Sequence, residues 1–335
     1  MKKFLIFALV VGFTLFALSS NAQQITIKAV SAFPKPHANN DGVQMFIDKV
    51  NERLKGKVEI KWLGGPEVIA AFDQISALKK GTIDMILYYP FGYMKPLMPE
   101  AEAKGLTELA EWEERVTGAF KLWEEIFEKR VNAKYLGRFH SLIPFMMYTN
   151  KKITKLEDFK GMKIRVMPLY VPFIQALGAS PVMIPPTEIH TAMERKVVDG
   201  FMWPRVGMTS WGLQEVTKYM ILPGVFQMEP ATMINLDVWK KLPADAQKVI
   251  SETMKDMEYI ATMRQMMIME KEDKQRLRAG MEFVEMPKPE AEKFVNLVYE
   301  KTWEAVLKSA PDYGPKLRKL TSKAALPKGA FPWQD

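Results

Sequence analysis

Apolar and polar residues follow two periods along the chain, that of a strand and that of a helix, and segments of the two kinds alternate. Residues 25–32 alternate apolar and polar side chains as a strand does, residues 42–53 repeat apolar positions at helical spacing, and residues 56–62 return to the strand pattern after a glycine turn. A further helix and strand follow at residues 72–80 and 82–88. Strands that alternate with helices predict an α/β domain with a largely parallel sheet.

The alternation continues through the rest of the chain. Helical periodicity over residues 112–131 precedes a strand pattern at 134–138, and we expect the chain to pass into a second α/β lobe near residues 141–150. A helical pattern from Ala244 to about Ala279 is longer than an ordinary globular helix. Its methionines could suggest a copper site or a recognition groove, but their helical spacing favours packing against the rest of the protein.

The first 22 residues carry the pattern of a cleavable secretory signal. Two lysines precede the apolar run Phe4 to Leu18, and Ser20-Asn21-Ala22 supplies small residues before Gln23. A membrane anchor is the alternative, but the run is short for a span and no second apolar stretch of about 18 residues follows. With no cysteine for a lipid anchor, a disulfide or a thiolate metal site, the sequence predicts a periplasmic protein.

Charge and motifs limit the classes of function. The formal net charge is +8, or +6 without the two leader lysines (8 minus 2), and the lysines are scattered along amphipathic helices. This distribution favours a positive field that attracts anionic ligands over a nucleic-acid surface. The chain has no GxSxG, Walker or GxGxxG motif, so a hydrolase built from Glu67, His37 and a serine has no positive support.

The segment from Lys155 to Pro204 is the most specific stretch of the chain. It places Arg165 at the end of the strand MKIRV, then a helix, the strand ASPVMI, a Pro-Pro turn, a helix carrying Glu188, and an Asp-Gly turn before Phe201-Met202-Trp203. This spacing resembles the signature of the solute receptors of TRAP (tripartite ATP-independent periplasmic) transporters, the DctP family.

The resemblance implies a complete architecture and a role. The fold would be a two-lobed α/β binding protein with two mixed, mainly parallel sheets and a long helix spanning both lobes. Lobe I would comprise residues 23–141 plus 231–262, lobe II residues 142–230 plus 263–320, and residues 321–335 a tail. Such a receptor is no enzyme and needs no cofactor. It hands an organic acid to small and large membrane subunits that draw on an ion gradient. A ligand sensor for a membrane signalling receptor would use the same cleft.

In this family the arginine at the position of Arg165 clamps the carboxylate of the ligand. A side chain at the carboxyl end of a strand can reach the crevice of an open sheet, and a guanidinium fork matches both carboxylate oxygens. The alternative is a surface arginine paired with Asp158 or Glu157. A second cation could come from Arg138 or His140 if the alignment with other receptors slips.

Departures from the family pattern predict an apolar cleft. Trp203 stands where many receptors for sialic acid or dicarboxylates have Asn, and Met202 stands where a metal-assisted subgroup has Glu, which disfavours a metal. Phe145 falls at the second arginine of sialic-acid receptors, and Tyr89 falls at a carboxylate of sugar-acid receptors. With one cation and these walls, an apolar or aromatic monocarboxylate fits best. The full set of expected ligand contacts is Arg165, Trp203, Phe145, Tyr89, Tyr88, Phe91, Met202, Glu67 and His37; the aromatic members could instead be core residues.

Overall fold

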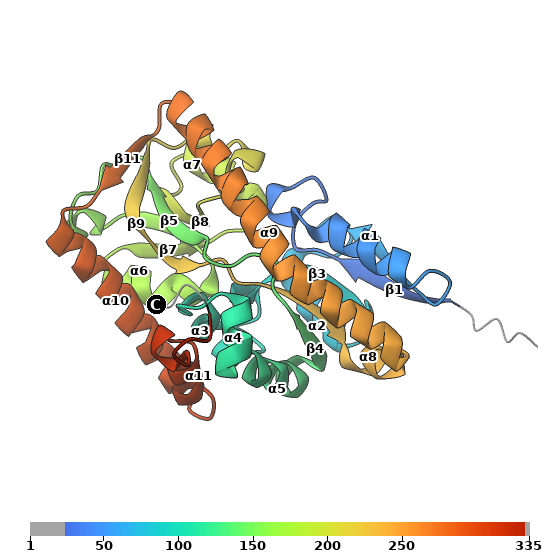
Figure 1. Cartoon of the computed structure of the whole chain (residues 1–335). Helices are drawn as coiled ribbons and strands as arrows, with labels where there is room; N and C mark the ends of the chain where they lie inside the picture. The colour runs from blue at the N-terminus through green and yellow to red at the C-terminus, as the bar shows by residue number, and fades with distance from the viewer. Residues whose placement is uncertain (1–23, 332–335) are drawn as a thin grey trace, which may run out of the picture.

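Two mixed β-sheets form the framework of the computed structural model, which describes residues 24–331 (Figure 1). The first sheet has the strand order β2-β1-β3-β10-β4. Strand β1 runs parallel to β2 and β3, whereas β10 runs antiparallel to β3 and β4. The strands are β1 Ile25–Val30, β2 Val58–Gly64, β3 Met85–Pro90, β4 Ala133–Gly137 and β10 Pro230–Asn235.

The second sheet has the strand order β11-β9-β5-β8-β6-β7. Strand β6 is parallel to β7 and β8, and β5 is antiparallel to β8 and β9. Both sheets are therefore mixed, as expected. The strands are β5 Pro144–Thr149, β6 Lys163–Val166, β7 Ser180–Met183, β8 Gly200–Pro204, β9 Tyr219–Gln227 and β11 Glu282–Glu285.

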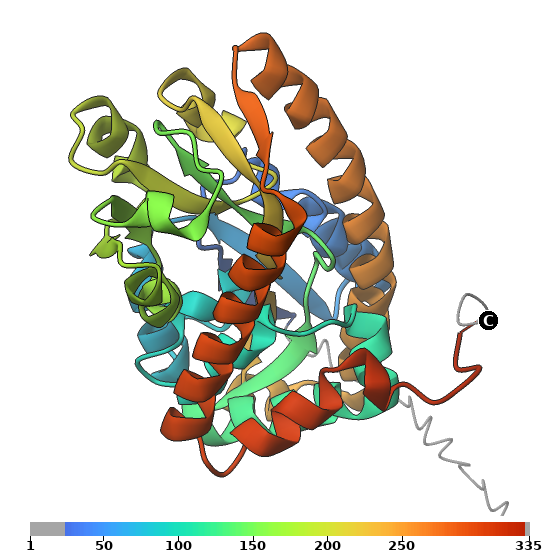
Figure 2. The ribbon, with the colours of Figure 1, turned by 90° about the vertical axis from the view of Figure 1, so that its left-hand side faces the viewer.

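Helices cover the sheets and join them. Helix α9 runs diagonally past both sheets in Figure 1, and Figure 2 shows α10 running down from the end of β11 on the side that faces the viewer. The helices are α1 Val43–Arg53, α2 Gln74–Lys79, α3 Glu102–Gly105, α4 Glu111–Thr117, α5 Ala119–Val131, α6 Val171–Ala176, α7 Ile189–Glu194, α8 Leu236–Lys241, α9 Ala244–Arg278, α10 Lys288–Ser309 and α11 Gly314–Leu320.

The 35-residue helix α9 connects the two halves of the molecule. Near its start, Glu252 accepts a hydrogen bond from Arg53 of α1 at 3.0 Å, and near its end, Asp273 pairs with Arg205, just after β8, at 2.8 Å. Thus the long helical pattern in the sequence is one continuous helix that spans both halves. The chain also crosses between the sheets at residues 138–143 and at 228–229.

Most expected strands and helices are present within a few residues, but some strands were not expected. Residues 141–150, expected only as a crossing, contain β5, and neither β9 nor β10 was expected. All six residues of β10 are buried, so its sequence shows no alternation that would mark one solvent-facing side. The expected leader lies outside the described residues. Within residues 24–331, no helix is both long and apolar enough to cross a membrane.

Candidate functional site

A cavity lies between the two sheets, close to the crossing at residues 228–229. It contains about 360 Å³ of empty space, including its opening to solvent. Its walls come from the carboxyl ends of β3, β6 and β8, from the loops that follow β1 and β6, and from the crossing. The lining residues are Phe33, Asn39, Tyr88, Pro90, Tyr93, Phe145, Arg165, Met167, Met202, Trp203, Pro204, Met228, Glu229 and Pro230.

Arg165 is the cation of this cavity and is only 1% exposed. Its Nε donates a hydrogen bond of 2.8 Å to the carbonyl oxygen of Ile184, and the Tyr93 hydroxyl bonds the guanidinium, but Nη2 has no partner. Burial lowers the pKa of Arg165 from its usual value, yet an arginine remains charged at neutral pH. Among the described residues no carboxylate forms an ion pair with it.

The alternative of a surface arginine is not what the structure shows. The Asp158 carboxylate bonds to the backbone of its own turn. It accepts hydrogen bonds from the amides of Thr154 and Lys155, at 2.9 and 3.2 Å. These bonds are the main cause of the lowered pKa of Asp158. Arg165 is thus left buried without an acidic partner in a cavity, which is costly unless a ligand supplies the opposite charge.

Aromatic rings surround the guanidinium. The Trp203 ring centroid lies 5.8 Å from the Arg165 guanidinium carbon, within the range of a cation–π contact. Phe33 meets Tyr88 and Trp203 edge-on, at centroid distances of 5.7 and 6.1 Å. Trp203 is 3% exposed and its indole N–H has no hydrogen-bond partner. Phe145 and Met202 also line the cavity.

Two of the expected aromatic residues lie elsewhere. Tyr89 follows Tyr88 in β3, and because side chains alternate along a strand, it leaves the strand on the opposite side. Its ring meets the Tyr93 ring edge-on, at a centroid distance of 5.6 Å. Phe91 packs in the core against Trp123, at a centroid distance of 5.0 Å. Neither residue lines the cavity.

Two residues of the first-lobe loops also lie outside the lining. Glu67 accepts a hydrogen bond of 2.6 Å from the amide of Gly65, so its carboxylate stabilises the loop. His37 stacks on Phe33 at 4.8 Å and lies 5.1 Å from Trp211 across the opening. Burial lowers the pKa of His37 to about 3, so its ring is neutral at the rim.

Contacts across the opening show that the structure is closed. Besides the His37–Trp211 contact, the amide of Ala38 lies 3.4 Å from the hydroxyl of Ser210. A Cβ atom on Gly207 would lie 2.2 Å from the Asn39 side-chain oxygen, so the two halves meet here without room for a side chain.

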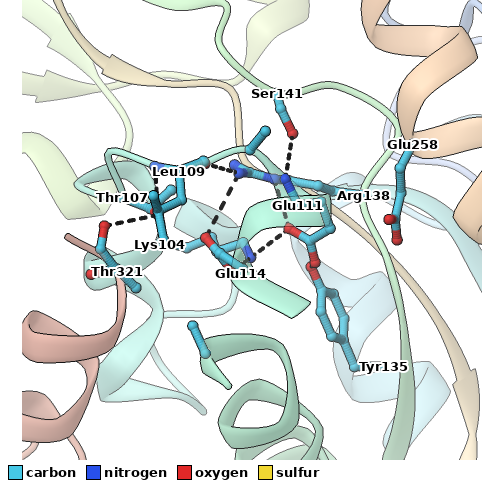
Figure 3. A network of polar contacts seen from close by, with 12 residues as sticks. Lys104, Thr107, Leu109, Glu111, Glu114, Tyr135, Arg138, Ser141, Glu258 and Thr321 are labelled. Atoms are coloured by element: carbon cyan, nitrogen blue, oxygen red, sulfur yellow. Dashed lines mark hydrogen bonds and ion pairs between the residues drawn. The ribbon is translucent and has the colours of Figure 1, made fainter. Parts of the chain in front are cut away.

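Arg138 and His140, the candidate second cations, do not line the cavity. Arg138 belongs to a fully buried ion network (Figure 3). Its Nε lies 2.8 Å from Glu111, its Nη2 lies 3.7 Å from Glu114, and Lys104 pairs with both carboxylates. The network therefore balances two cations with two anions. Lys104 and Arg138 hold the pKa of Glu111 below its usual value despite its burial.

Sequence reasoning missed several lining residues, above all Glu229. This residue is 2% exposed, lines the cavity, and has no hydrogen bond to either carboxyl oxygen. Burial raises its pKa to about 8. The available signal was a single acidic residue within the otherwise uncharged segment from Tyr219 to Asn235. Tyr93 and Met167 were also missed.

Within residues 24–331, no three His, Cys, Asp or Glu side chains are grouped so that they could hold a metal ion. The cavity offers a buried guanidinium, phenol and indole donors, and apolar walls, which are the means to bind an anion.

The two sheets, the helix that spans them and the cavity between them define a solute-binding protein of the two-lobed α/β class. The family model for bacterial extracellular solute-binding protein family 7, DctP, matches residues 30–308, so the chain belongs to this family. This membership confirms the resemblance to TRAP solute receptors.

Known relatives are distant in sequence. An uncharacterized protein of Haemophilus influenzae is 35% identical over 109 residues, 32% of this chain, and the chain spans only 33% of that protein. The C4-dicarboxylate-binding periplasmic protein DctP of Rhodobacter capsulatus is 22% identical over 266 residues, covering 70% of this chain and 72% of that protein.

Solved structures share the fold. A TRAP periplasmic solute-binding protein from Desulfovibrio salexigens with bound orotic acid has a TM-score of 0.80 at 22% identity, covering 88% of this chain and 97% of that chain. DctP7, a Bordetella pertussis receptor binding pyroglutamic acid, has a TM-score of 0.78 at 16% identity, covering 88% and 99%. Another similar structure, from Chromohalobacter salexigens, holds D-glucuronate.

Proposed function

We propose that the protein captures an organic acid, an apolar or aromatic monocarboxylate, in the periplasm and delivers it to the membrane subunits of a TRAP transporter. One observation carries the proposal: Arg165 is the single cation among the described residues that line the cavity, and its Nη2 is unpaired. A carboxylate bound to Nη2 would accept a charge-assisted hydrogen bond and neutralise the buried charge of the guanidinium.

The lining supports a ligand with an apolar body. The rings of Phe33, Tyr88, Phe145 and Trp203 face the cavity, and apolar area removed from water contributes about 25 cal/mol per Å². A sugar acid would need hydrogen-bond partners for several hydroxyl groups. Similar structures hold both kinds of acid, since orotic acid is a flat ring and D-glucuronate is a sugar acid. The proposal of an apolar body is therefore supported by the lining of this cavity and not by the comparisons.

Delivery to a transporter is supported by membership in an extracellular solute-binding family and by the architecture. The cavity is closed by contacts between the two halves, so a ligand can enter and leave only if they separate about the crossings. A receptor that changes shape with its ligand can signal its loaded state to a membrane partner.

A thermal-shift screen of the protein against a library of carboxylic acids tests the proposal, because a ligand raises the apparent stability by mass action. We expect aromatic and aliphatic monocarboxylates to stabilise the protein, and calorimetry to show binding at least about 2 kcal/mol weaker for Arg165→Gln. Arg318→Gln is the matched control, because Arg318 lies far from Arg165 in the sequence and pairs with Glu300 on the surface. Stabilisation only by sugar acids, or undiminished binding by Arg165→Gln, contradicts the proposal.

A further inference from the structure

Glu229 faces the same cavity as Arg165, from the crossing between β9 and β10. Its backbone is fixed, because its carbonyl oxygen accepts a hydrogen bond of 3.0 Å from the amide of Phe91 and the next residue, Pro230, pairs with Pro90. The side chain is 2% exposed and neither carboxyl oxygen has a hydrogen-bond partner. A buried carboxyl group of this kind is costly unless something in the cavity pairs with it.

The surroundings leave Glu229 without a counter-ion. Arg138 is the cation that acts on it, but Arg138 is shared with Glu111 and Glu114 in the balanced network of Figure 3. Its remaining bonds go to backbone, at 2.6 Å to the Leu109 carbonyl and 3.2 Å to the Met228 carbonyl. The backbone amides of Gly92 and of Glu229 itself favour the charged form of the Glu229 carboxyl group. Neither amide forms a hydrogen bond with it, however.

The other titratable groups near Glu229 are phenols. Tyr88 of β3, Tyr93 of the 3-10 helix Phe91–Tyr93 and Tyr170 of the 3-10 helix Pro168–Tyr170 all interact electrostatically with Glu229. Burial raises the pKa of each phenol, so all three are neutral. Desolvation therefore prevails at Glu229, and with a pKa of about 8 its carboxyl group is mainly protonated, and so neutral, at pH 7.

We infer that the unpaired carboxyl group of Glu229 pairs with the end of the ligand that lies away from the Arg165 clamp. One oxygen donates its O–H to a carbonyl oxygen of the ligand, and the other accepts an N–H beside that carbonyl. Tyr93 and Tyr170 interact with both Arg165 and Glu229, which places the two groups around one ligand site. The inference rests on the proposed carboxylate capture and names its ligand class: ring acids that carry a lactam or imide edge.

This arrangement makes capture sensitive to pH. When Glu229 loses its proton, a second negative charge appears in a cavity that already holds the ligand carboxylate. The ionised side chain also loses the O–H that it donates. We therefore expect affinity to fall about tenfold per pH unit above about pH 8 and to be level below it. Arg165 does not titrate in this range.

Two matched pairs of probes test the inference: pyroglutamate with cyclopentanecarboxylate, and orotate with benzoate. In each pair the ring size is the same, and only the first member carries a lactam or imide edge. Calorimetry from about pH 6 to about pH 9.5 should show that wild type binds at least one lactam or imide acid about tenfold or more tightly than its partner, with this preference lost above pH 8.

Variants separate the neutral acid from the ionised one. Glu229→Gln keeps a neutral donor and acceptor, so it should retain the preference to within a few fold and lose the pH dependence. Glu229→Leu should lose the preference and still bind the hydrocarbon-ring acids. Melting curves confirm that both variants are folded.

The outcomes are distinct. If Glu229→Gln loses as much affinity as Glu229→Leu, or if Glu229→Leu keeps the wild-type preference and pH profile, the inference is overturned while carboxylate capture stands. If no probe binds, or if Arg165→Gln binds the probes as wild type does, carboxylate capture itself fails and the inference fails with it.

Discussion

Arg165 and Trp203 reach the cavity from strands that lie next to each other in the second sheet. In the register of β6 with β8, Arg165 is paired with Phe201, two residues before Trp203. The cation and the indole therefore keep a fixed distance of 5.8 Å, and a carboxylate bound to the guanidinium would lie beside an aromatic surface. At the scale of single residues, this neighbourhood supports the proposed preference for an acid with an apolar or aromatic body.

Replacing Trp203 with Asn should weaken the binding of an aromatic or aliphatic monocarboxylate by about 1–3 kcal/mol, because the largest apolar wall is lost. Isothermal titration calorimetry with the best acid from the screen measures the effect. Trp203→Phe is the control, since it keeps an apolar ring and should lose less. Equal affinity of wild type and Trp203→Asn for such an acid would show that the ring is only a core residue.

Gly207 shows how closely two elements approach at the opening. It has a φ of 86°, in the left-handed region, and the position of an added Cβ lies 2.2 Å from Asn39 Oδ1 and 3.1 Å from His37 Cε1. Since Asn39 is itself buried, it has little freedom to withdraw. The loop after β8 and the loop after β1 can therefore meet only because this residue is glycine.

Gly207→Ala should hinder closure and weaken acid binding about tenfold or more, while each half stays folded. The control is Gly56→Ala, where φ is 79° but an added Cβ meets nothing within 4 Å. The control variant should lose about 1 kcal/mol of stability and no affinity. Calorimetry and chemical denaturation measure the two quantities, and similar affinity losses in both variants would rule out a contact across the opening as the cause.

The ion network of Figure 3 ties helices α3 and α4 to the crossing. Lys104→Met should destabilise the protein by about 3–5 kcal/mol, because Glu111 and Glu114 then share one cation in a buried site. Adding Glu114→Gln should recover part of the loss by restoring charge balance. Lys301→Met, which removes an exposed pair on α10, should change the urea midpoint little. A small effect of Lys104→Met would show that the network adds no stability.

At the scale of the whole molecule, burial of histidines makes stability depend on pH. Burial lowers the pKa of His140 from 6.5 to about 4, so the unfolded chain binds a proton more readily. The contribution of His140 is therefore complete above pH 6.5 and is lost as the pH falls from 6.5 towards 4, by roughly 3 kcal/mol.

Urea unfolding of wild type and His140→Gln across this range tests the prediction. The difference between the free energies of unfolding of the two proteins should change by roughly 3 kcal/mol between pH 7 and pH 4. The contributions of other titrating groups cancel in this difference. His190→Gln is the control, as His190 is only partly buried. Parallel stability profiles for wild type and His140→Gln would show that His140 does not titrate in the folded protein as expected.

Local patterns in the sequence were sufficient for the class of protein and for most elements. Helix and strand periods are set by neighbours a few residues away, so β1, α1 and the long α9 could be predicted from them. The position of Arg165 near the end of a strand was likewise readable, because parallel strands present their carboxyl ends at one edge.

Tertiary structure alone decided which of the expected contacts reach the cavity. The sequence determined that Tyr88 and Tyr89 lie on opposite faces of a strand, but only packing against the second sheet decided that Tyr88 faces the cavity and Phe91 the core. Arg138 lies outside the cavity, because it pairs with Glu111 and Glu114. Glu229 lines the cavity from a crossing between the two sheets. Charge balance and burial are sums over residues distant in the chain, so no local pattern contains them.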